Sequence, residues 1–209
     1  MPTLAVNPTH HIFYQEDDFT DPWENKPTII LQHGSGRNSG FWYRWIPFLS
    51  SHFRVIRPDM RGVGQSSKFP ISQITIEACL EDLVKIITTT CSGPVYFCGE
   101  SMGGILGIIL AAEYPKLIQS LTLIATPVYI NDSMKEKYAL GYSSRLEAMK
   151  SMGIKEWVRQ TSIMTRFPPE TDPQLINWYV DEFAKGNPET LIRYSELVSN
   201  AHALQFLSK

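Results

Sequence analysis

The sequence contains only three cysteines, Cys79, Cys91 and Cys98, among its 209 residues. An odd number of cysteines cannot be fully paired in disulfides, and these three have no spacing typical of a metal site. We therefore expect reduced thiols, as in a cytoplasmic protein. The N-terminal stretch, residues 1–13, lacks the basic and apolar regions of a secretory signal, which agrees with that location.

Long apolar runs and an excess of charge are missing as well. The longest apolar run, residues 103–112, is far shorter than the roughly 20 residues that a membrane-spanning helix needs. The formal net charge is −2, and the basic side chains form no cluster or stripe along the sequence. We therefore expect neither a nucleic acid nor a membrane as a partner. The composition does not indicate the oligomeric state.

What is present is enough apolar sequence, 43% of the chain, to bury a substantial core. Up to residue 126, short apolar stretches alternate with helix-like ones, which is typical of an α/β fold with a doubly wound, mostly parallel sheet. We expect this core to span residues 1–126. Its expected strands are residues 10–15, 27–32, 53–57, 95–98 and 121–125, and its expected helices are residues 41–50, 76–87 and 102–112.

From residue 127 onward the alternation of strands and helices stops. Four helix-like segments follow, separated by prolines and polar residues, near residues 133–152, 155–165, 172–185 and 188–207. A helical block inserted after several strands of a doubly wound sheet is expected to cover the carboxyl ends of the strands, where such sheets bind ligands. We therefore expect residues 127–209 to form a helical cap.

The most informative stretch is Gly-Glu-Ser-Met-Gly at residues 99–103. It follows an apolar strand-like run and precedes an apolar helix-like run. Ser101 would then lie on a sharp strand-to-helix turn, where Gly99 and Gly103 leave room because neither has a Cβ atom. A serine held in this way is accessible to a base and to a substrate carbonyl, as a nucleophile must be. The pattern therefore predicts that Ser101 is a catalytic nucleophile.

Three motifs follow successive expected strands: His-Gly-Ser-Gly at residues 33–36, Asp-x-Arg-Gly-x-Gly-x-Ser at residues 59–66 and Gly-Glu-Ser-Met-Gly-Gly at residues 99–104. With these motifs in this order, the sequence resembles the α/β-hydrolase superfamily, in particular its capped serine hydrolases such as 3-oxoadipate enol-lactonases and carboxylesterases. The resemblance implies a serine hydrolase that needs no cofactor. It also implies that Ser101 attacks the substrate and that the backbone N–H groups of Ser35 and Met102 form the oxyanion hole.

The same resemblance implies a catalytic acid and a catalytic histidine, carried by strands that follow the cap. Because residue 209 comes directly after the last expected cap helix, we expect both groups, and the remaining core strands, to lie outside this sequence. Asp132 is the nearest carboxylate that could replace the acid. His202 is the only late histidine, but it falls inside the expected last cap helix. We expect His33 to brace its loop, and Glu100 to be solvated or paired with a loop.

Large apolar side chains of the expected cap could cover the site. We expect the substrate pocket to involve Gly34 and, from the cap, Trp157, Met164, Trp178 and Tyr179. No pair of basic side chains is expected to converge in the cap segments. Such a pocket would favour an apolar or aromatic part of a substrate over a polyanion.

These expectations lead to a serine-dependent hydrolase that cleaves a small-molecule carboxylic ester or lactone through an acyl-enzyme on Ser101. A C–C bond hydrolase of the same fold would use the same serine and oxyanion hole, so this alternative stays open. A non-catalytic ligand-binding protein that keeps the pocket is a second alternative.

Overall fold

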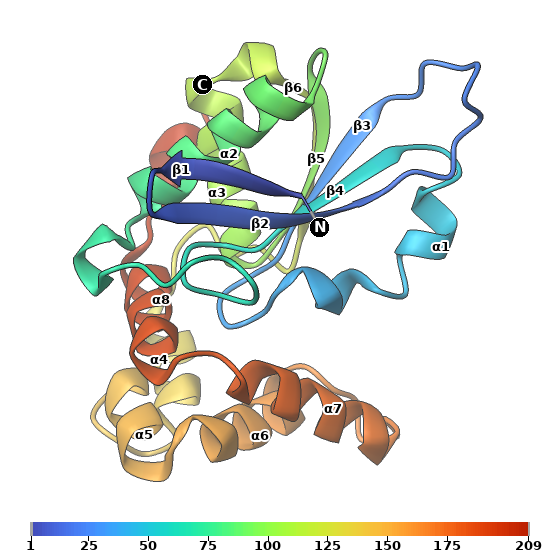
Figure 1. Cartoon of the computed structure of the whole chain (residues 1–209). Coiled ribbons are helices and arrows are strands. Elements are labelled where there is room, and N and C mark those ends of the chain that lie inside the picture. Colours follow the sequence, from blue (N-terminus) through green and yellow to red (C-terminus); the bar gives the residue numbers. More distant parts are fainter. Residues whose placement is uncertain (1, 209) are drawn as a thin grey trace.

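The computed structural model describes residues 2–208 and contains one sheet of six strands (Figure 1): β1 (Thr3–Asn7), β2 (His10–Asp17), β3 (Thr28–Gln32), β4 (Arg54–Pro58), β5 (Val95–Glu100) and β6 (Ile118–Ile124). The strand order across the sheet is β1-β2-β4-β3-β5-β6. The last four strands in this order run parallel to one another, whereas β2 is antiparallel to β4 and β1 is antiparallel to β2. The expected mostly parallel sheet is confirmed.

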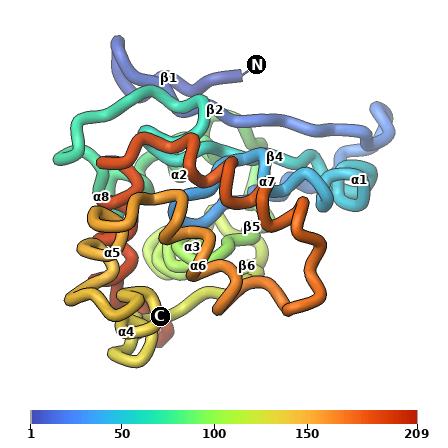
Figure 2. The backbone as a smooth tube through the Cα atoms, turned by 90° about the horizontal axis from the view of Figure 1, so that it is seen from below, coloured from blue at the N-terminus to red at the C-terminus, as the bar shows by residue number. Residues whose placement is uncertain are grey.

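Helices cover both faces of the sheet. The core helices are α1 (Ile46–Leu49), α2 (Ile76–Thr90) and α3 (Met102–Glu113). In Figure 2, α2 and α3 lie on one side of the strands and α1 lies on the other. Side chains alternate between the two faces, as expected for strands buried on both sides. Ile30 and Phe97 are buried with α2 and α3, whereas their neighbours Leu31 and Cys98 are buried on the α1 side.

Two parts of the core differ from the sequence-based expectation. Residues 3–7 form the additional strand β1, and in the turn to β2 the Asn7 side chain accepts hydrogen bonds from the N–H groups of Thr9 and His10. The helix expected at residues 41–50 is instead a 3₁₀ turn (Ser39–Trp42) followed by the four-residue α1. Pro47, the second residue of α1, has no N–H group with which to continue a helix from the preceding turn.

Residues 132–200 form five helices, which we call the helical segment and which lie below the sheet in Figure 1. They are α4 (Asp132–Ala139), α5 (Arg145–Met152), α6 (Ile154–Thr165), α7 (Pro173–Ala184) and α8 (Pro188–Asn200). The helix expected at residues 133–152 is divided in two, because Leu140 (φ 51°) and Gly141 (φ 83°) adopt left-handed backbone conformations that end α4. The last helix ends at Asn200, seven residues earlier than the expected residue 207.

The helical segment has an apolar core of its own, in which Trp157, Phe183 and Leu191 are buried. Helix α8 joins this segment to the sheet, since Tyr194 belongs to the main core beside α2 and α3. The Tyr194 hydroxyl donates a hydrogen bond of 2.9 Å to the Arg61 carbonyl in the loop after β4. The two parts of the molecule are therefore joined by buried contacts as well as by the chain.

The two connections between the helical segment and the core run side by side. Tyr129 and His202 form an isolated antiparallel β-bridge. Next to this bridge, the Ala203 N–H donates a hydrogen bond of 2.7 Å to the Val128 carbonyl. The chain therefore leaves the core and returns to it at one place.

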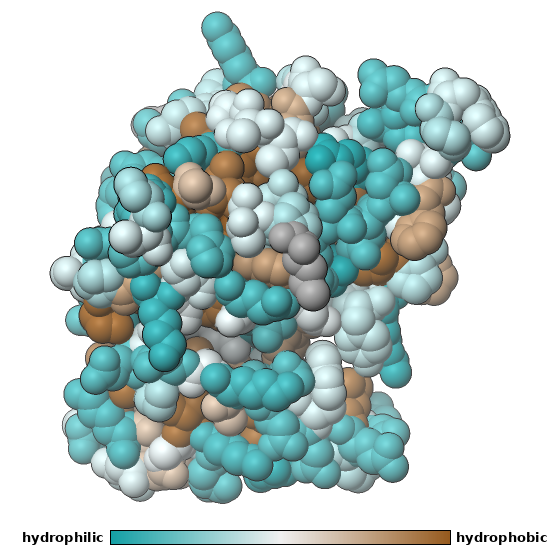
Figure 3. Space-filling view, viewed as in Figure 1, coloured by the Kyte–Doolittle hydropathy of each residue, from teal (hydrophilic) through white to brown (hydrophobic). Residues whose placement is uncertain are grey.

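The face of the molecule in Figure 3 is mainly hydrophilic, and hydrophobic residues appear on it in small separate groups. The large apolar side chains gather instead in the main core and in the core of the helical segment. Within residues 2–208, no helix combines the length and the apolar character needed to cross a bilayer.

Candidate active site

Ser101 lies on the turn between β5, which ends at Glu100, and α3, which begins at Met102. Its backbone has φ 52° and ψ −116°, a strained conformation for a residue with a side chain. A Cβ atom on Gly99 would overlap the backbone of Gly103, and one on Gly103 would overlap the carbonyl oxygen of Gln32 in β3. The two glycines thus let α3 pack directly on the ends of β3 and β5, which holds Ser101 at the carboxyl end of the sheet.

Backbone N–H groups lie close to the Ser101 turn. Met102 is the first residue of α3, so its N–H has no partner within the helix and lies at the positive end of the helix dipole. The loop after β3 passes next to this turn, since a Cβ atom on Gly34 would be 2.9 Å from the Ser101 Cβ. Ser35 follows in that loop, and its hydroxyl is buried without a hydrogen-bond partner. The two residues expected to supply an oxyanion hole therefore lie on neighbouring segments, Met102 at the start of α3 and Ser35 in the loop after β3.

His33 is buried and holds two loops together. Its Nδ1 lies 2.8 Å from the Gly34 carbonyl oxygen, and its Nε2 accepts a hydrogen bond of 3.1 Å from the Met60 N–H. Burial lowers the pKa of His33, although the nearby Asp59 carboxylate opposes this effect. A neutral ring that donates through Nδ1 and accepts through Nε2 satisfies both contacts. The expected role of His33 as a brace is confirmed.

Glu100, the residue before Ser101, forms an ion pair with Arg37 from the loop after β3. Arg37 also donates a hydrogen bond of 2.7 Å to the Tyr179 hydroxyl of α7. Burial lowers the pKa of Arg37, but Tyr179 and Glu100 more than offset this, so its pKa lies above the ordinary arginine value. Glu100 thus pairs with a loop, one of the two expected roles. Through Arg37 it also links the Ser101 turn to the helical segment.

A pocket of about 480 Å³ opens between the Ser101 side of the sheet and α7. Trp178 and Tyr179 line it, and both pack against Phe41, with ring centroids 5.1 Å and 5.4 Å apart. Its lining includes neither Gly34 nor Ser101. The other two expected side chains lie elsewhere. Trp157 is fully buried inside the helical segment, and Met164, near the end of α6, is 57% exposed. The further lining residues are His33, Arg37, Phe41, Trp42, Tyr43, Arg44, Trp45, Glu100, Ile124, Ala125, Thr165, Arg166, Phe167 and Leu175.

Asp132 and His202 lie at the two ends of the helical segment. Asp132 is the first residue of α4, and its carboxylate pairs with Lys135 at 3.2 Å on the protein surface. His202 lies beyond the end of α8, contrary to the expectation that a helix includes it, and its ring stacks on Tyr129 with centroids 6.0 Å apart. Among the hydrogen bonds of residues 2–208, none joins a histidine ring to the Ser101 hydroxyl.

Arginines near the pocket are the functional candidates that the sequence did not indicate. Arg37 and Arg166 line the pocket. Arg145 and Arg166 both place their guanidinium groups over the Tyr138 ring, at 5.2 Å and 5.7 Å from its centroid. The expectation that no basic pair converges in this segment is therefore wrong. These side chains come from the loop after β3, the start of α5 and the residue after α6, and no local sequence pattern predicts that convergence. Arg37 could have been noticed, since it shares a loop with Gly34 and Ser35.

Metal-binding side chains do not gather at this site, since the described chain contains no group of three or more histidine, cysteine, aspartate or glutamate side chains placed to hold an ion. The three cysteines do not belong to such a group either. Burial raises the pKa of Cys98, behind the Ser101 turn, to about 11. Among the described residues, the Ser101 turn therefore remains the candidate reactive part of this site.

The alpha/beta hydrolase fold family matches residues 27–194, which include β3 to β6 and most of the helical segment. The chain belongs to this family. The α/β-hydrolase fold also accounts for the similarity to solved structures. An enol-lactonase from Burkholderia xenovorans has a TM-score of 0.78 and 26% identity, over 96% of this chain and 74% of that one. An esterase from Exiguobacterium antarcticum reaches a TM-score of 0.80 at 17% identity, over 95% and 73%, and supports the fold alone.

Among curated relatives, a putative carbamate hydrolase RutD from Agrobacterium fabrum is 35% identical over 135 residues, which cover 64% of this α/β-hydrolase chain and 49% of the relative. The 3-oxoadipate enol-lactonase 1 from Acinetobacter baylyi is 29% identical over 140 residues, 66% of this chain and 49% of that protein. The chain thus spans about half the length of these relatives.

Proposed function

We propose that this α/β-hydrolase chain provides the nucleophile and substrate pocket of a serine hydrolase that cleaves a carboxylic ester or lactone. The observation that carries the proposal is the conformation of Ser101, with φ 52° on a turn between a buried strand and a buried helix. A strained serine conformation is costly and is typical of functional sites. This turn corresponds to the nucleophile elbow of α/β-hydrolases.

In the proposed reaction, the Ser101 hydroxyl oxygen attacks the ester carbonyl carbon as its proton passes to a base. The backbone N–H groups of Met102 and Ser35 stabilise the negative oxygen of the tetrahedral intermediate, each by about 3 kcal/mol if they act as in other oxyanion holes. The base then returns its proton to the alcohol oxygen as the bond to that oxygen breaks, which leaves an acyl-enzyme. Water attacks the acyl carbon as its proton passes to the base, and the acid is released when the Ser101 oxygen takes that proton back. The base must be a group other than His33, whose two ring nitrogens are already engaged.

The proposed substrate class rests on the pocket and on the relatives. Aromatic side chains from the loop after β3 and from α7 line the pocket, which suits a small organic ester. A lactone fits the enol-lactonase relative and structural neighbour, and a carbamate would fit the relative of that name. We further propose that residues 1–126 are the hydrolase core, that residues 127–209 are the cap covering the site, and that the protein acts in the cytoplasm.

The nucleophile is tested with a fluorophosphonate probe, followed by mass spectrometry of the adduct. Added imidazole supplies a base in one arm of the experiment. We expect the adduct on Ser101, no adduct in Ser101→Ala, and unchanged labelling in Ser92→Ala, a matched control on an exposed turn. An adduct on another serine with Ser101 unmodified, or no adduct in either arm, would show that the proposal is wrong.

A further inference from the structure

A second cavity lies within the helical segment, and we call it the helical-segment cavity. Its volume is about 550 Å³, and its lining comes mainly from α4, α5, α8 and the loop between α4 and α5. It has no lining residue in common with the pocket between the sheet and α7. Its size falls within the range of pockets that hold small molecules. The helical-segment cavity is therefore a candidate ligand site separate from the Ser101 turn.

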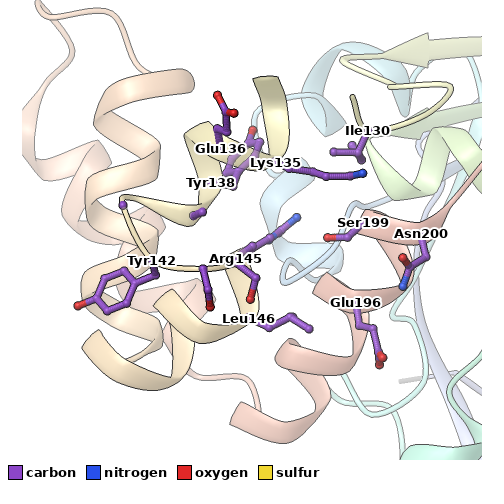
Figure 4. A pocket seen from close by; sticks show the side chains of 14 residues that line it. Ile130, Lys135, Glu136, Tyr138, Tyr142, Arg145, Leu146, Glu196, Ser199 and Asn200 are labelled. Carbon is purple, nitrogen blue, oxygen red and sulfur yellow. The ribbon is translucent and has the colours of Figure 1, made fainter. Parts of the chain in front are cut away.

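Arg145, the first residue of α5, extends into this cavity towards α8 (Figure 4). Its guanidinium carbon lies over the rings of Tyr138 and Trp157, at 5.2 Å and 4.8 Å from their centroids. None of the ion pairs within residues 2–208 includes Arg145, and its buried Nε has no hydrogen-bond partner. Two aromatic rings therefore hold a cation at the cavity without a carboxylate to neutralise it.

The positive charge of Arg145 is unfavourable in this environment. Burial is the main reason that the pKa of Arg145 falls to about 10, and the neighbouring charge of Arg166 contributes to the fall. At neutral pH the side chain is still a cation, and its contacts with the two rings offset only part of the cost of burial. An anion in the cavity would supply the missing negative charge and accept hydrogen bonds from the guanidinium group.

Lys135 of α4 brings a second cation to the helical-segment cavity. Its side chain extends towards α8, as that of Arg145 does (Figure 4). The Lys135 ammonium group pairs with Asp132 at 3.2 Å, but this ion pair is on the surface, where the Asp132 side chain is 93% exposed. Exposed ion pairs contribute little free energy. Lys135 is therefore available to an anion that enters the cavity.

The two carboxylates that line the cavity do not neutralise these cations. In Figure 4, the carboxylates of Glu136 and Glu196 point away from the Arg145 guanidinium group. Glu196 is instead paired with Arg193 at 2.7 Å. The space between Arg145 and Lys135 thus has an excess of positive charge.

The N-terminus of α5 faces the same cavity, since Ser144, Arg145 and Leu146 all line it. Ser144 caps the helix, and its hydroxyl accepts a hydrogen bond of 3.1 Å from the Glu147 N–H. The N–H groups of Arg145 and Leu146, in the first turn, have no partner within the helix. A helix N-terminus favours anions through such N–H groups and the helix dipole. This preference adds to that of the two side-chain cations.

We propose that the helical-segment cavity binds a phosphoryl group at Arg145 and Lys135. A guanidinium group pairs with two oxygens, and a phosphoryl group offers a third oxygen to Lys135, whereas a carboxylate has only two. The cavity is larger than a phosphate ion, and Ile130 and Leu146 line the part that suits the organic portion of a small organic phosphate. The inference goes beyond the proposed hydrolase function and does not rest on it.

Calorimetry with the full chain at low salt tests the ligand chemistry, because salt screens exposed charges. The probes are phenyl phosphate, inorganic phosphate, benzoate as the carboxylate and benzyl alcohol as the neutral compound. We expect both phosphates to bind, and the other two compounds to bind more weakly by about tenfold or more. Tighter binding of phenyl phosphate than of inorganic phosphate would identify an organic phosphate as the ligand. Equal binding of the two would identify free phosphate as the ligand of the same site.

Variants of the two cations test the site itself. Arg145→Met should weaken the binding of phenyl phosphate by about tenfold or more, and Lys135→Met by about threefold. Lys137→Met is the matched control and should bind like the unmodified protein, since Lys137 lies on α4 but does not line the cavity. If Arg145→Met fails to fold, Lys135→Met decides the question, because the Lys135 side chain is 54% exposed.

Hydrogen exchange locates the bound phosphate. With phenyl phosphate we expect slower exchange in α4 and α5 and no change in α7, whose Trp178 and Tyr179 line the other pocket. No binding of either phosphate, equal binding of benzoate, undiminished binding in both variants, or protection of α7 alone would overturn the proposal. None of these readouts uses the Ser101 hydroxyl, so the phosphoryl site and the proposed hydrolase function can each fail while the other stands.

Discussion

Gly103 determines how closely α3 approaches β3. A Cβ atom at this position would overlap the Gln32 carbonyl oxygen, which belongs to the backbone and cannot rotate away. Backbone-to-backbone approach of this kind is available only to glycine. The position of Ser101 therefore depends on a residue that has no functional group of its own.

Gly103→Ala should lower the free energy of unfolding by about 3 kcal/mol or displace α3. The physical reason is the overlap with β3, and urea unfolding followed by circular dichroism measures the loss. Gly93→Ala is the matched control, because a Cβ atom there would meet nothing within 4 Å. Equal stability of the two variants would contradict the packing described for the Ser101 turn.

The buried ring of His33 makes stability depend on pH. Burial lowers the pKa of His33 below its ordinary value of 6.5, which the unfolded chain retains. Below pH 6.5 the unfolded chain therefore binds a proton that the folded protein does not. The stability that the protein gains from keeping His33 neutral is fully present above pH 6.5. It is lost as the pH falls towards the pKa of His33 in the folded protein.

As the pH falls below 6.5, we expect the unfolding free energy to fall with a limiting slope of about 1.4 kcal/mol per pH unit from His33. Urea unfolding at several pH values measures this slope. It should become smaller in His33→Gln and should persist in His52→Gln, since His52 is exposed. An unchanged slope in His33→Gln would show that another group is responsible.

Helix α8 is the element that fixes the helical segment to the core. Tyr194 is fully buried, and its hydroxyl lies between the Arg61 carbonyl at 2.9 Å and the Cys79 sulfur at 3.7 Å. Arg61 is itself held by Asp82 of α2 through two hydrogen bonds. One side chain of α8 therefore contacts both the loop after β4 and α2.

Tyr194→Phe should cost about 1–2 kcal/mol of unfolding free energy, because it leaves the buried Arg61 carbonyl without its hydrogen bond. Tyr129→Phe, at a side chain that is 44% exposed, should change stability by less than about 0.5 kcal/mol. Denaturant titration of both variants makes the comparison. A neutral Tyr194→Phe would mean that water replaces the hydroxyl.

Elements defined by contiguous sequence were predictable, whereas contacts between distant elements were not. The turn at Ser101 follows from an apolar run, two glycines and a second apolar run that adjoin one another. The division of the helix expected at residues 133–152 depends on Leu140 in a left-handed conformation, which its residue type does not favour. The convergence of Arg145 and Arg166 on Tyr138 depends on the packing of separate helices. Local patterns carry no information about such packing.

At the scale of the whole molecule, the three cysteines lie in different parts of the fold. Cys79 belongs to the main core, and Cys98 belongs to the layer between the sheet and α1; each is 3% exposed. Cys91, at the end of α2, is half-buried. Cys79 and Cys98 therefore report on two buried layers of the fold, and Cys91 reports on its partly exposed edge.

Iodoacetamide at about pH 8 should modify Cys91 in the native protein and leave the other two cysteines unmodified. Burial raises the pKa of Cys79 to about 12 and that of Cys98 to about 11, so neither forms the reactive thiolate. Peptide mass spectrometry over time measures each site, and a sample in denaturant is the control in which all three react. Rapid native modification of Cys79 would contradict the described main core.

The antiparallel bridge between Tyr129 and His202 has a consequence for how the helical segment of this molecule can change. A segment that leaves and re-enters the core at one place can change in length or be exchanged for another without moving the core. The helical segment can thus be replaced as a unit, while the strained Ser101 turn and its glycines stay unchanged. Chimaeras joined at Val128 and Ala203, where one hydrogen bond already closes the gap, would exploit this property.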